Sequence, residues 1–383
     1  MKRPHLTYLL ILTFVVLFAA GAYALESHAF TRAEQLTGLS TLAGKGNKGG
    51  ALHAANVAAN YAETLRYWGA ISLTIAAAIA LPGIVEYVLL QLMGFSRVGA
   101  IARVTYYEAI FQPFTIIVFI LCVAAIVITS FVPFNTFGED TKMFRDVALS
   151  FALMFSLIIM VFATGKVVDE EIEDRTMLTL MSKPIARWQV VLGKYAGIVL
   201  LILVVLGIAT MTAALGSYLR FFSDKRIDIA VSGAHGKALL FWDNLRGVIA
   251  LLPAFVLQFG ELCTLAAISI AIATRYSLAL NMTVIVLLYI GANLTRFVPL
   301  LHLGQPWQGL AVSASYLLPY LSNFDLNQCL VYRPFTVGQH YVKGGPTLSQ
   351  IWQYVGLACV YSVLYIGGAL GVAMAMFRNR ELT

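Results

Sequence analysis

The sequence carries very little charge. Only 12% of its 383 residues are Asp, Glu, Lys or Arg, whereas 60% are hydrophobic. An ordinary soluble domain has about a quarter of its residues charged, so this composition excludes that class. Most of the chain is predicted to lie in lipid.

Cysteine is also scarce. Of the 4 cysteines, three fall in apolar runs (Cys122, Cys263 and Cys359), which leaves Cys329 without a partner for a disulfide. No CxxC or HExxH pattern occurs, so nothing predicts a metal site. The histidines of the polar loops are scattered, which favours solvated side chains over metal ligands: His28, His53, His235, His302 and His340.

A phosphate-binding loop is missing from the sequence. The nearest string, GLSTLAGKG at 38–46, has one residue too many between its glycines and no Ser or Thr after Lys45. No paired catalytic constellation occurs either. The sequence therefore predicts that the chain is not an enzyme and does not hydrolyse nucleotide by itself.

Long apolar runs are abundant. About eight of them approach the length of a helical span: 7–25, 68–93, 113–131, 147–166, 193–216, 247–273, 278–297 and 351–376. A closed barrel would need alternating polar positions, and these runs are apolar on all faces. The predicted fold is an all-α polytopic membrane helix bundle.

The N-terminus has two interpretations. Lys2 and Arg3 precede an apolar run that ends in Ala22-Tyr23-Ala24, so the segment is either an uncleaved first span or a signal peptide cleaved after Ala24. The glycine-rich segment 26–66 is predicted to be a polar outer loop. The density of Lys and Arg in the loops favours cytoplasmic N- and C-termini.

The densest charges lie in one segment, 165–197, called here the charged segment. An acidic run is followed by apolar residues at helical spacing: Asp169, Glu170, Glu171, Glu173 and Asp174, then Met177, Leu180 and Met181. Carboxylates favour helix N-termini, so this pattern predicts a short amphipathic helix projecting from the membrane. The alternative is a plain solvated loop.

A corner and a return to the bilayer should follow that helix. Pro184 disfavours helical geometry at Lys183 and suits a first helical turn, which predicts a corner at Ser182 and Lys183. Further along, aromatic and basic residues are expected at the headgroup level: Arg187, Trp188, Lys194 and Tyr195.

The string EEIEDRTMLTLMSKPIARWQVVLGKYAG at 170–197 resembles the coupling segment of permease subunits of type-two ABC exporters. The matching elements are an acidic run, Thr, an apolar stretch, Ser-Lys-Pro, Arg and Gly-Lys: Glu170, Glu171, Glu173, Thr176, 178–181, Ser182, Lys183, Pro184, Arg187, Gly193 and Lys194. The resemblance implies a coupling helix near 167–183 that contacts an ATPase. Met177, Leu178, Leu180 and Met181 would supply apolar contact, and Glu170, Glu171, Glu173 and Arg175 complementary charge.

Two weaker similarities flank this segment. VGAIARVTYYE at 98–108 is similar to the amphipathic interface helix before that family's first core span, with Arg97, Arg103 and Glu108 toward the cytoplasm. Residues 377–382 are like the family's basic ending. The resemblance thus covers a six-span permease core at 97–383, and residues 1–96 form an N-terminal extension with two further spans.

The resemblance implies a division of labour. A separate cytoplasmic ATPase subunit would bind ATP and Mg, while this chain, which needs no cofactor of its own, would provide the membrane pathway. A second permease copy or a paralogue would complete a dimer in the plasma membrane. The chain would also contact the lipid bilayer, and no nucleic acid is expected as a partner.

Polar residues within the spans are candidates for the substrate pathway. Glu261 with Gln258, near the middle of 247–273, and Glu86 in 68–93 are intramembrane positions that are rare and often functional. A structural role inside the bundle is the alternative. Pro253 is predicted to kink its helix.

The string LLPYLSNFDL at 317–326 is similar to the short re-entrant helix before that family's last span. It is expected to form either an outer gate or a packed interfacial helix.

Several functional classes remain open at this point. The first is an ATP-driven exporter permease. The second is a mechanically coupled permease for maturation or assembly of extracytoplasmic proteins, because some relatives serve the maturation of periplasmic metalloenzymes. An ATPase-independent channel or carrier is the third, and a membrane-embedded enzyme the fourth.

Overall fold

The computed structural model describes residues 82–134, 140–173, 186–224, 247–295, 318–326, 330–331 and 347–378. The chain divides into two compact units, Met1–Val85 and Glu86–Thr383. Of the first unit only 82–85 are described, as the beginning of the helix Pro82–Met93. The predicted span 7–25 and the loop 26–66 lie outside the described residues. The predicted division at residue 96 stays a prediction.

Helices make up nearly all of the described residues, and no strand occurs among them. In chain order they are α3 (Arg97–Ile110), α4 (Pro113–Phe131), α5 (Asp140–Glu173), α7 (Arg187–Asp224), α10 (Leu251–Ala273), α11 (Leu278–Leu294), the 3-10 helix η2 (Leu321–Phe324) and α13 (Leu348–Arg378). The prediction of an all-α bundle is confirmed for this part of the chain.

Five helices of the described part are long and apolar enough to cross a membrane: Pro113–Phe131, Asp140–Val167, Trp188–Phe221, Gly247–Ala273 and Leu348–Met376. The predicted spans 147–166 and 193–216 were too short. Arg145 and Arg220 lie outside the predicted apolar runs because they are charged. Both arginines are buried in the bundle, and the helices continue past them.

The helix α11 is shorter than expected. It is apolar but has 17 residues, ending at Leu294, whereas 278–297 was predicted to span. At 1.5 Å per residue, a helix of this length reaches about 25 Å, less than a hydrocarbon core of about 30 Å. The predicted count of six core spans therefore stays a prediction.

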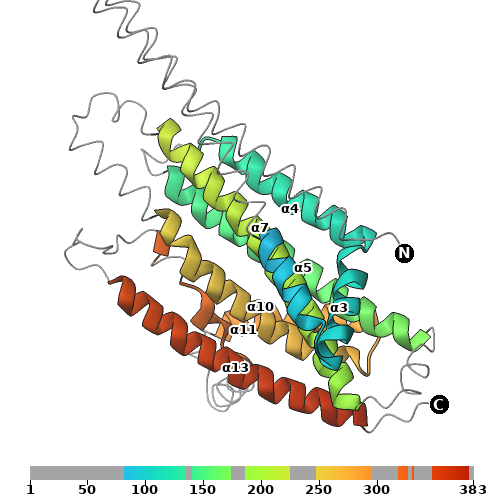
Figure 1. Cartoon of the computed structure of the whole chain (residues 1–383). Helices are drawn as coiled ribbons and strands as arrows, with labels where there is room; N and C mark the ends of the chain where they lie inside the picture. Colours follow the sequence, from blue (N-terminus) through green and yellow to red (C-terminus); the bar gives the residue numbers. More distant parts are fainter. Residues whose placement is uncertain are drawn as a thin grey trace, which may run out of the picture. The chain divides into compact units, whose positions relative to one another are not determined.

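The helices differ in how much of their surface is covered by protein. Of the 18 most apolar consecutive residues in Gly247–Ala273, 67% are buried. The corresponding share is 28% in Pro113–Phe131 and 22% in Leu348–Met376. In Figure 1, α4 lies at one edge of the bundle and α13 at another, with α5, α7 and α10 between them, and α3 packs along α7. The exposed apolar faces of α4 and α13 are those expected to meet lipid.

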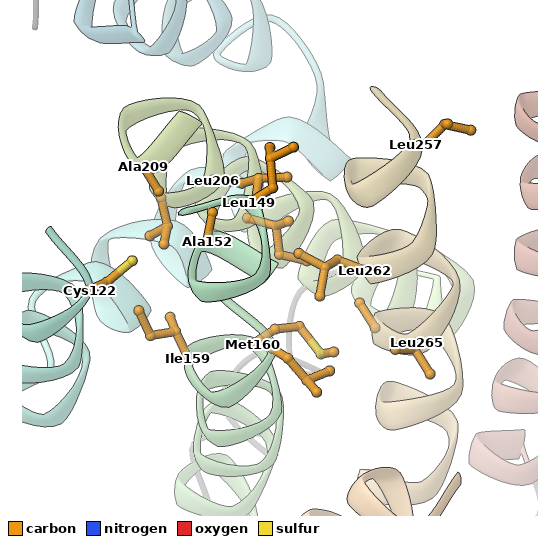
Figure 2. Close-up of a cluster of buried hydrophobic side chains, with 14 of the residues drawn as sticks. Cys122, Leu149, Ala152, Ile159, Met160, Leu206, Ala209, Leu257, Leu262 and Leu265 are labelled. Carbon is orange, nitrogen blue, oxygen red and sulfur yellow. The ribbon is translucent and has the colours of Figure 1, made fainter. Parts of the chain in front are cut away.

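The core of the bundle forms where α5, α7 and α10 meet. Figure 2 shows side chains of α5 (Leu149, Ala152, Ile159, Met160), α7 (Leu206, Ala209) and α10 (Leu257, Leu262, Leu265), with Cys122 of α4 beside them. All are buried. Because apolar residues lie on every face of these helices, the sequence could not show which face is the inner one.

The predicted kink at Pro253 stays a prediction. The helix is continuous from Leu251 to Ala273, and Pro253 lies in its first turn. The backbone N–H groups of a first turn have no intrahelical acceptor, so the missing N–H of proline breaks no hydrogen bond there. The irregularity lies before the helix, at the turn residue Ala250.

Candidate functional site

The charged segment joins two long helices at one end of the bundle. Its acidic residues Glu170, Glu171 and Glu173 belong to the last turns of α5, which runs without a break from Asp140 to Glu173. The expectation that the acidic run opens a short helix is therefore wrong, because nothing between Gly165 and Glu173 interrupts the helix in the sequence. The run belongs instead to a long helix, which is described as far as Glu173.

The rest of the predicted coupling residues lie outside the described part of the chain. These are Arg175, Thr176, Met177, Leu178, Leu180, Met181, Ser182, Lys183 and Pro184. Description resumes at Ala186, and Arg187 is the first residue of α7. The two ends of the segment are therefore held by α5 and α7, and its predicted contact with an ATPase stays a prediction.

Two residues at the start of α7 lie deeper than expected. Lys194 is 4% exposed, and its ammonium donates to the Val167 carbonyl of α5 at 3.5 Å. The Tyr195 hydroxyl donates to the Cys263 carbonyl of α10 at 3.3 Å. Trp188, in contrast, is exposed as predicted for a headgroup anchor. Lys194 and Tyr195 thus tie α7 to its neighbours rather than to the membrane surface.

A buried polar network joins α5, α10 and α11 close to the charged segment. The Thr164 and Ser269 hydroxyls lie 2.6 Å apart, and the Asn281 side chain exchanges two hydrogen bonds with Ser269, at 3.0 and 3.2 Å. All three side chains are at most 1% exposed. Beside them, a Cβ on Gly165 would overlap the end of the Leu278 side chain, so this glycine leaves space for that side chain between α5 and α11.

The predicted interface helix is present as α3. Its N-cap is Ser96, whose hydroxyl accepts a hydrogen bond from the Gly99 N–H at 2.9 Å. Arg97 is exposed, and Glu108 is half-buried. Arg103 folds back and donates to the Leu90 carbonyl, so it ties α3 to the preceding helix.

The helix α3 packs on two glycines of α7. A Cβ on Gly193 would lie 2.7 Å from Ile101, and one on Gly197 would lie 2.6 Å from the Ala102 carbonyl oxygen. Such spacing, Gly193-x-x-x-Gly197, lets helix backbones approach closely in membranes. Sequence reasoning missed this contact, although the GxxxG pattern inside GKYAG was a signal that could have found it.

Glu261 occupies the middle of the span Gly247–Ala273 and is 4% exposed. No side chain or backbone donor of the described residues bonds to its carboxyl group. Tyr289 of α11 and Asp325, which follows η2, lie close enough to act on it electrostatically. An unpartnered carboxyl group at this depth is costly, which is why such positions are examined first for function.

Gln258 lies one turn before Glu261 on α10. Its amide nitrogen donates to the Leu149 carbonyl of α5 at 3.1 Å. Its amide oxygen is buried and has no donor within the described ranges. The predicted pair is thus brought together on α10, and each member has hydrogen-bonding capacity that the described residues leave unused.

The segment before the last span covers this part of α10. The described residues 318–326 hold the short η2 rather than a longer helix, and the ring of Phe324 lies against Gly260. Two hydrogen bonds fasten the segment to α13: Tyr354 donates to the Asn323 carbonyl at 2.8 Å, and the Tyr320 N–H donates to the Tyr361 hydroxyl at 2.9 Å. A role as outer gate stays a prediction.

Glu86 has a different setting from Glu261. Its carboxylate accepts a hydrogen bond from the Tyr106 hydroxyl of α3 at 2.5 Å. Glu86 is 5% exposed, so this bond links the helix Pro82–Met93 to α3 inside the protein. The structure therefore brings Glu261 and Gln258 together but places Glu86 at the contact with α3.

Long apolar helices, packed around an apolar core that includes a few buried polar side chains, define this chain as a polytopic membrane protein of the all-α class. The family model described as ABC-2 family transporter protein matches residues 4–382. The chain belongs to this family, as a permease of an ABC transporter. The match begins near the N-terminus and so includes the extension that the sequence resemblance left outside. A comparison with curated proteins finds no match.

Proposed function

We propose that this permease moves a substrate outward, driven by a separate ATPase subunit that binds ATP and Mg and contacts the charged segment. A second permease, either a copy or a paralogue, completes the assembly in the plasma membrane, with both termini cytoplasmic. The family membership supports the permease role. The observation that carries the coupling proposal is the way α5 and α7 are joined to the rest of the bundle.

Both helices that flank the charged segment are tied to neighbours close to it. α5 is bonded through Thr164 to Ser269 of α10 and through Ser269 to Asn281 of α11. α7 is packed against α3 at Gly193 and Gly197. Because packed interfaces move as units rather than deform, a push on the charged segment is passed to several helices at once.

The charge at the end of α5 indicates what kind of partner the segment needs. Four acidic residues, Asp169, Glu170, Glu171 and Glu173, fall in the last described turns of the helix. Like charges three and four residues apart on one helix repel one another, so this arrangement is unfavourable in isolation. A basic surface on an ATPase would offset that repulsion and give the contact its orientation.

The test is to purify the tagged permease from native membranes in mild detergent and identify its partners by mass spectrometry. A stoichiometric ATPase is expected with the native chain. It should be lost when Glu170 and Glu171 are reversed to Lys or when 177–181 are made polar, and retained in the control Glu381→Lys. Recovery of the permease alone in several detergents would contradict the proposal and favour an ATPase-independent carrier.

Export itself needs a second measurement. The purified complex, reconstituted in vesicles with ATP on the coupling side, should deplete that side of a substrate. An intact complex that hydrolyses ATP but moves no solute, and instead changes the state of an extracytoplasmic protein, would identify the alternative, a mechanically coupled maturation permease.

A further inference from the structure

Glu261 and Gln258 of α10 have complementary hydrogen-bonding groups that the described residues leave unused. Glu261 is 4% exposed, and no described donor bonds to its carboxyl group. Gln258 is 3% exposed, and its amide nitrogen donates to the Leu149 carbonyl of α5 at 3.1 Å. Because a carbonyl oxygen only accepts, this bond fixes which end of the amide faces α5. The amide oxygen is left without a donor in the described part of the chain.

A proton on Glu261 would satisfy both groups. An ionised carboxylate only accepts hydrogen bonds, whereas a protonated carboxyl group has one O–H to donate. Glu261 and Gln258 are three positions apart, a spacing that brings side chains together on one face of a helix. The acid O–H is therefore placed to donate to the amide oxygen of Gln258. A proton also needs no cavity of its own, since it is bound to a carboxyl oxygen.

The helices packed against α10 bring acids and phenols to this region. The titratable side chains on or beside this part of α10 are Tyr289 of α11, Asp325 after η2, Tyr195 of α7, Tyr354, Tyr361 and Tyr365 of α13, and Cys263 of α10 itself. None of these is a cation, and α5 has no titratable residue between Leu149 and Thr164. Lys194 of α7 is directed to the Val167 carbonyl of α5 instead. A buried carboxyl group in such surroundings becomes neutral by taking up a proton.

The segment 318–326 brings a second acid to Glu261. The ring of Phe324 lies against Gly260, the residue before Glu261, and Asp325 directly follows Phe324. While the segment is docked on α10, the negative charge of Asp325 disfavours ionisation of Glu261. Coupled equilibria are reciprocal, so a proton on Glu261 favours the docked segment by the same factor.

We propose that Glu261 binds a proton, which it donates in a hydrogen bond to Gln258, and that this proton keeps the segment 318–326 docked on α10. Loss of the proton leaves negative charge on both Glu261 and Asp325, and their repulsion releases the segment. Docking is therefore complete at low pH and is lost as the pH rises through the titration of Glu261. The proposal does not involve the charged segment, so it stands apart from the proposed ATPase coupling.

The first measurement is the infrared spectrum of the permease in nanodiscs, because the C=O stretch of a protonated carboxyl group is resolved from the bands of a carboxylate. At neutral pH the native chain should show a protonated-acid band that Glu261→Gln lacks. Gln258→Leu should move this band to higher frequency, because the acid loses its hydrogen-bond acceptor. The matched control is Glu86→Gln, which removes a buried carboxyl group bonded to Tyr106 and should keep the band.

The second measurement follows hydrogen exchange of the backbone amides of 321–326 against pH, relative to the rate of an unstructured peptide at each pH. In the native chain, protection should fall as the Glu261 band titrates, by up to tenfold per pH unit, the limit for one proton. Glu261→Gln stays neutral and should keep full protection at every pH. Asp325→Asn removes the repulsion, so its band should titrate at lower pH and its protection should not depend on pH.

The proposal is overturned if the native chain has no protonated-acid band that Glu261→Gln removes, or if Gln258→Leu leaves the band unmoved. It is also overturned if the band titrates while protection stays constant, since Glu261 would then bind a proton without holding the segment. Asp325 is exposed and has further interactions of its own, so Asp325→Asn measures how much of its charge reaches Glu261. That variant carries the second test if Glu261→Gln does not fold.

Discussion

The contact between α3 and α7 can be tested by adding a single methyl group. Gly197→Ala would place a Cβ 2.6 Å from the Ala102 carbonyl oxygen and 2.7 Å from the Thr105 Cβ, both in α3. Real Cβ atoms do not approach other atoms this closely, so α3 must move away. Gly207→Ala, on the same helix, is the matched control, because its added Cβ would meet nothing within 4 Å.

The magnitude follows from two opposing effects. Replacing glycine by alanine in a helix interior is favourable by about 1 kcal/mol at either position. Overpacking a close contact costs about 1 to 3 kcal/mol, and only Gly197→Ala incurs that cost. The free energy of unfolding of Gly197→Ala should therefore be about 1 to 3 kcal/mol below that of Gly207→Ala.

The assay measures the helix content of the two variants and of the native chain as each unfolds reversibly in mixed micelles. Amide hydrogen exchange adds a local measurement, since the backbone of α3 should exchange faster in Gly197→Ala only. Equal stability of the two variants, with unchanged exchange in α3, would refute the reasoning that these glycines hold α3 in place.

Three further predictions concern buried polar side chains. Asn281→Leu should lower the free energy of unfolding by about 1 to 3 kcal/mol relative to the control Asn293→Leu, because Asn281 bonds across helices whereas Asn293 bonds within its own helix; equal unfolding curves would contradict this. Tyr106→Phe should cost about 1 to 3 kcal/mol by removing the bond to Glu86, while Tyr107→Phe, which loses no bond to a described residue, should unfold like the native chain. Glu261→Leu should raise the free energy of unfolding by about 1 to 3 kcal/mol, by removing a buried carboxyl group with no bonded partner in the described part, and should lower substrate-stimulated ATP hydrolysis; a destabilised variant with normal activity would show that the carboxyl group is structural.

The class of this protein was predictable from the sequence because hydropathy is a local property. A span must be apolar over about 20 residues whatever it packs against, so 113–131 and 247–273 were placed correctly. The permease identity was predictable for a similar reason, since the string from Glu170 to Gly197 carries its family pattern in consecutive residues. Some predicted span boundaries were wrong, because a charged residue ends an apolar run in the sequence whether or not the protein buries that residue.

Only the tertiary structure decided which polar residues meet. Thr164, Ser269 and Asn281 are far apart in the sequence and unremarkable in type, yet they form one network. Glu86 and Glu261 were both candidates as intramembrane carboxylates, but one is bonded to Tyr106 and the other has no bonded partner in the described part. In a chain whose helices are apolar on every face, hydropathy states that a residue is in the membrane. The packing of the helices determines which neighbour it has there.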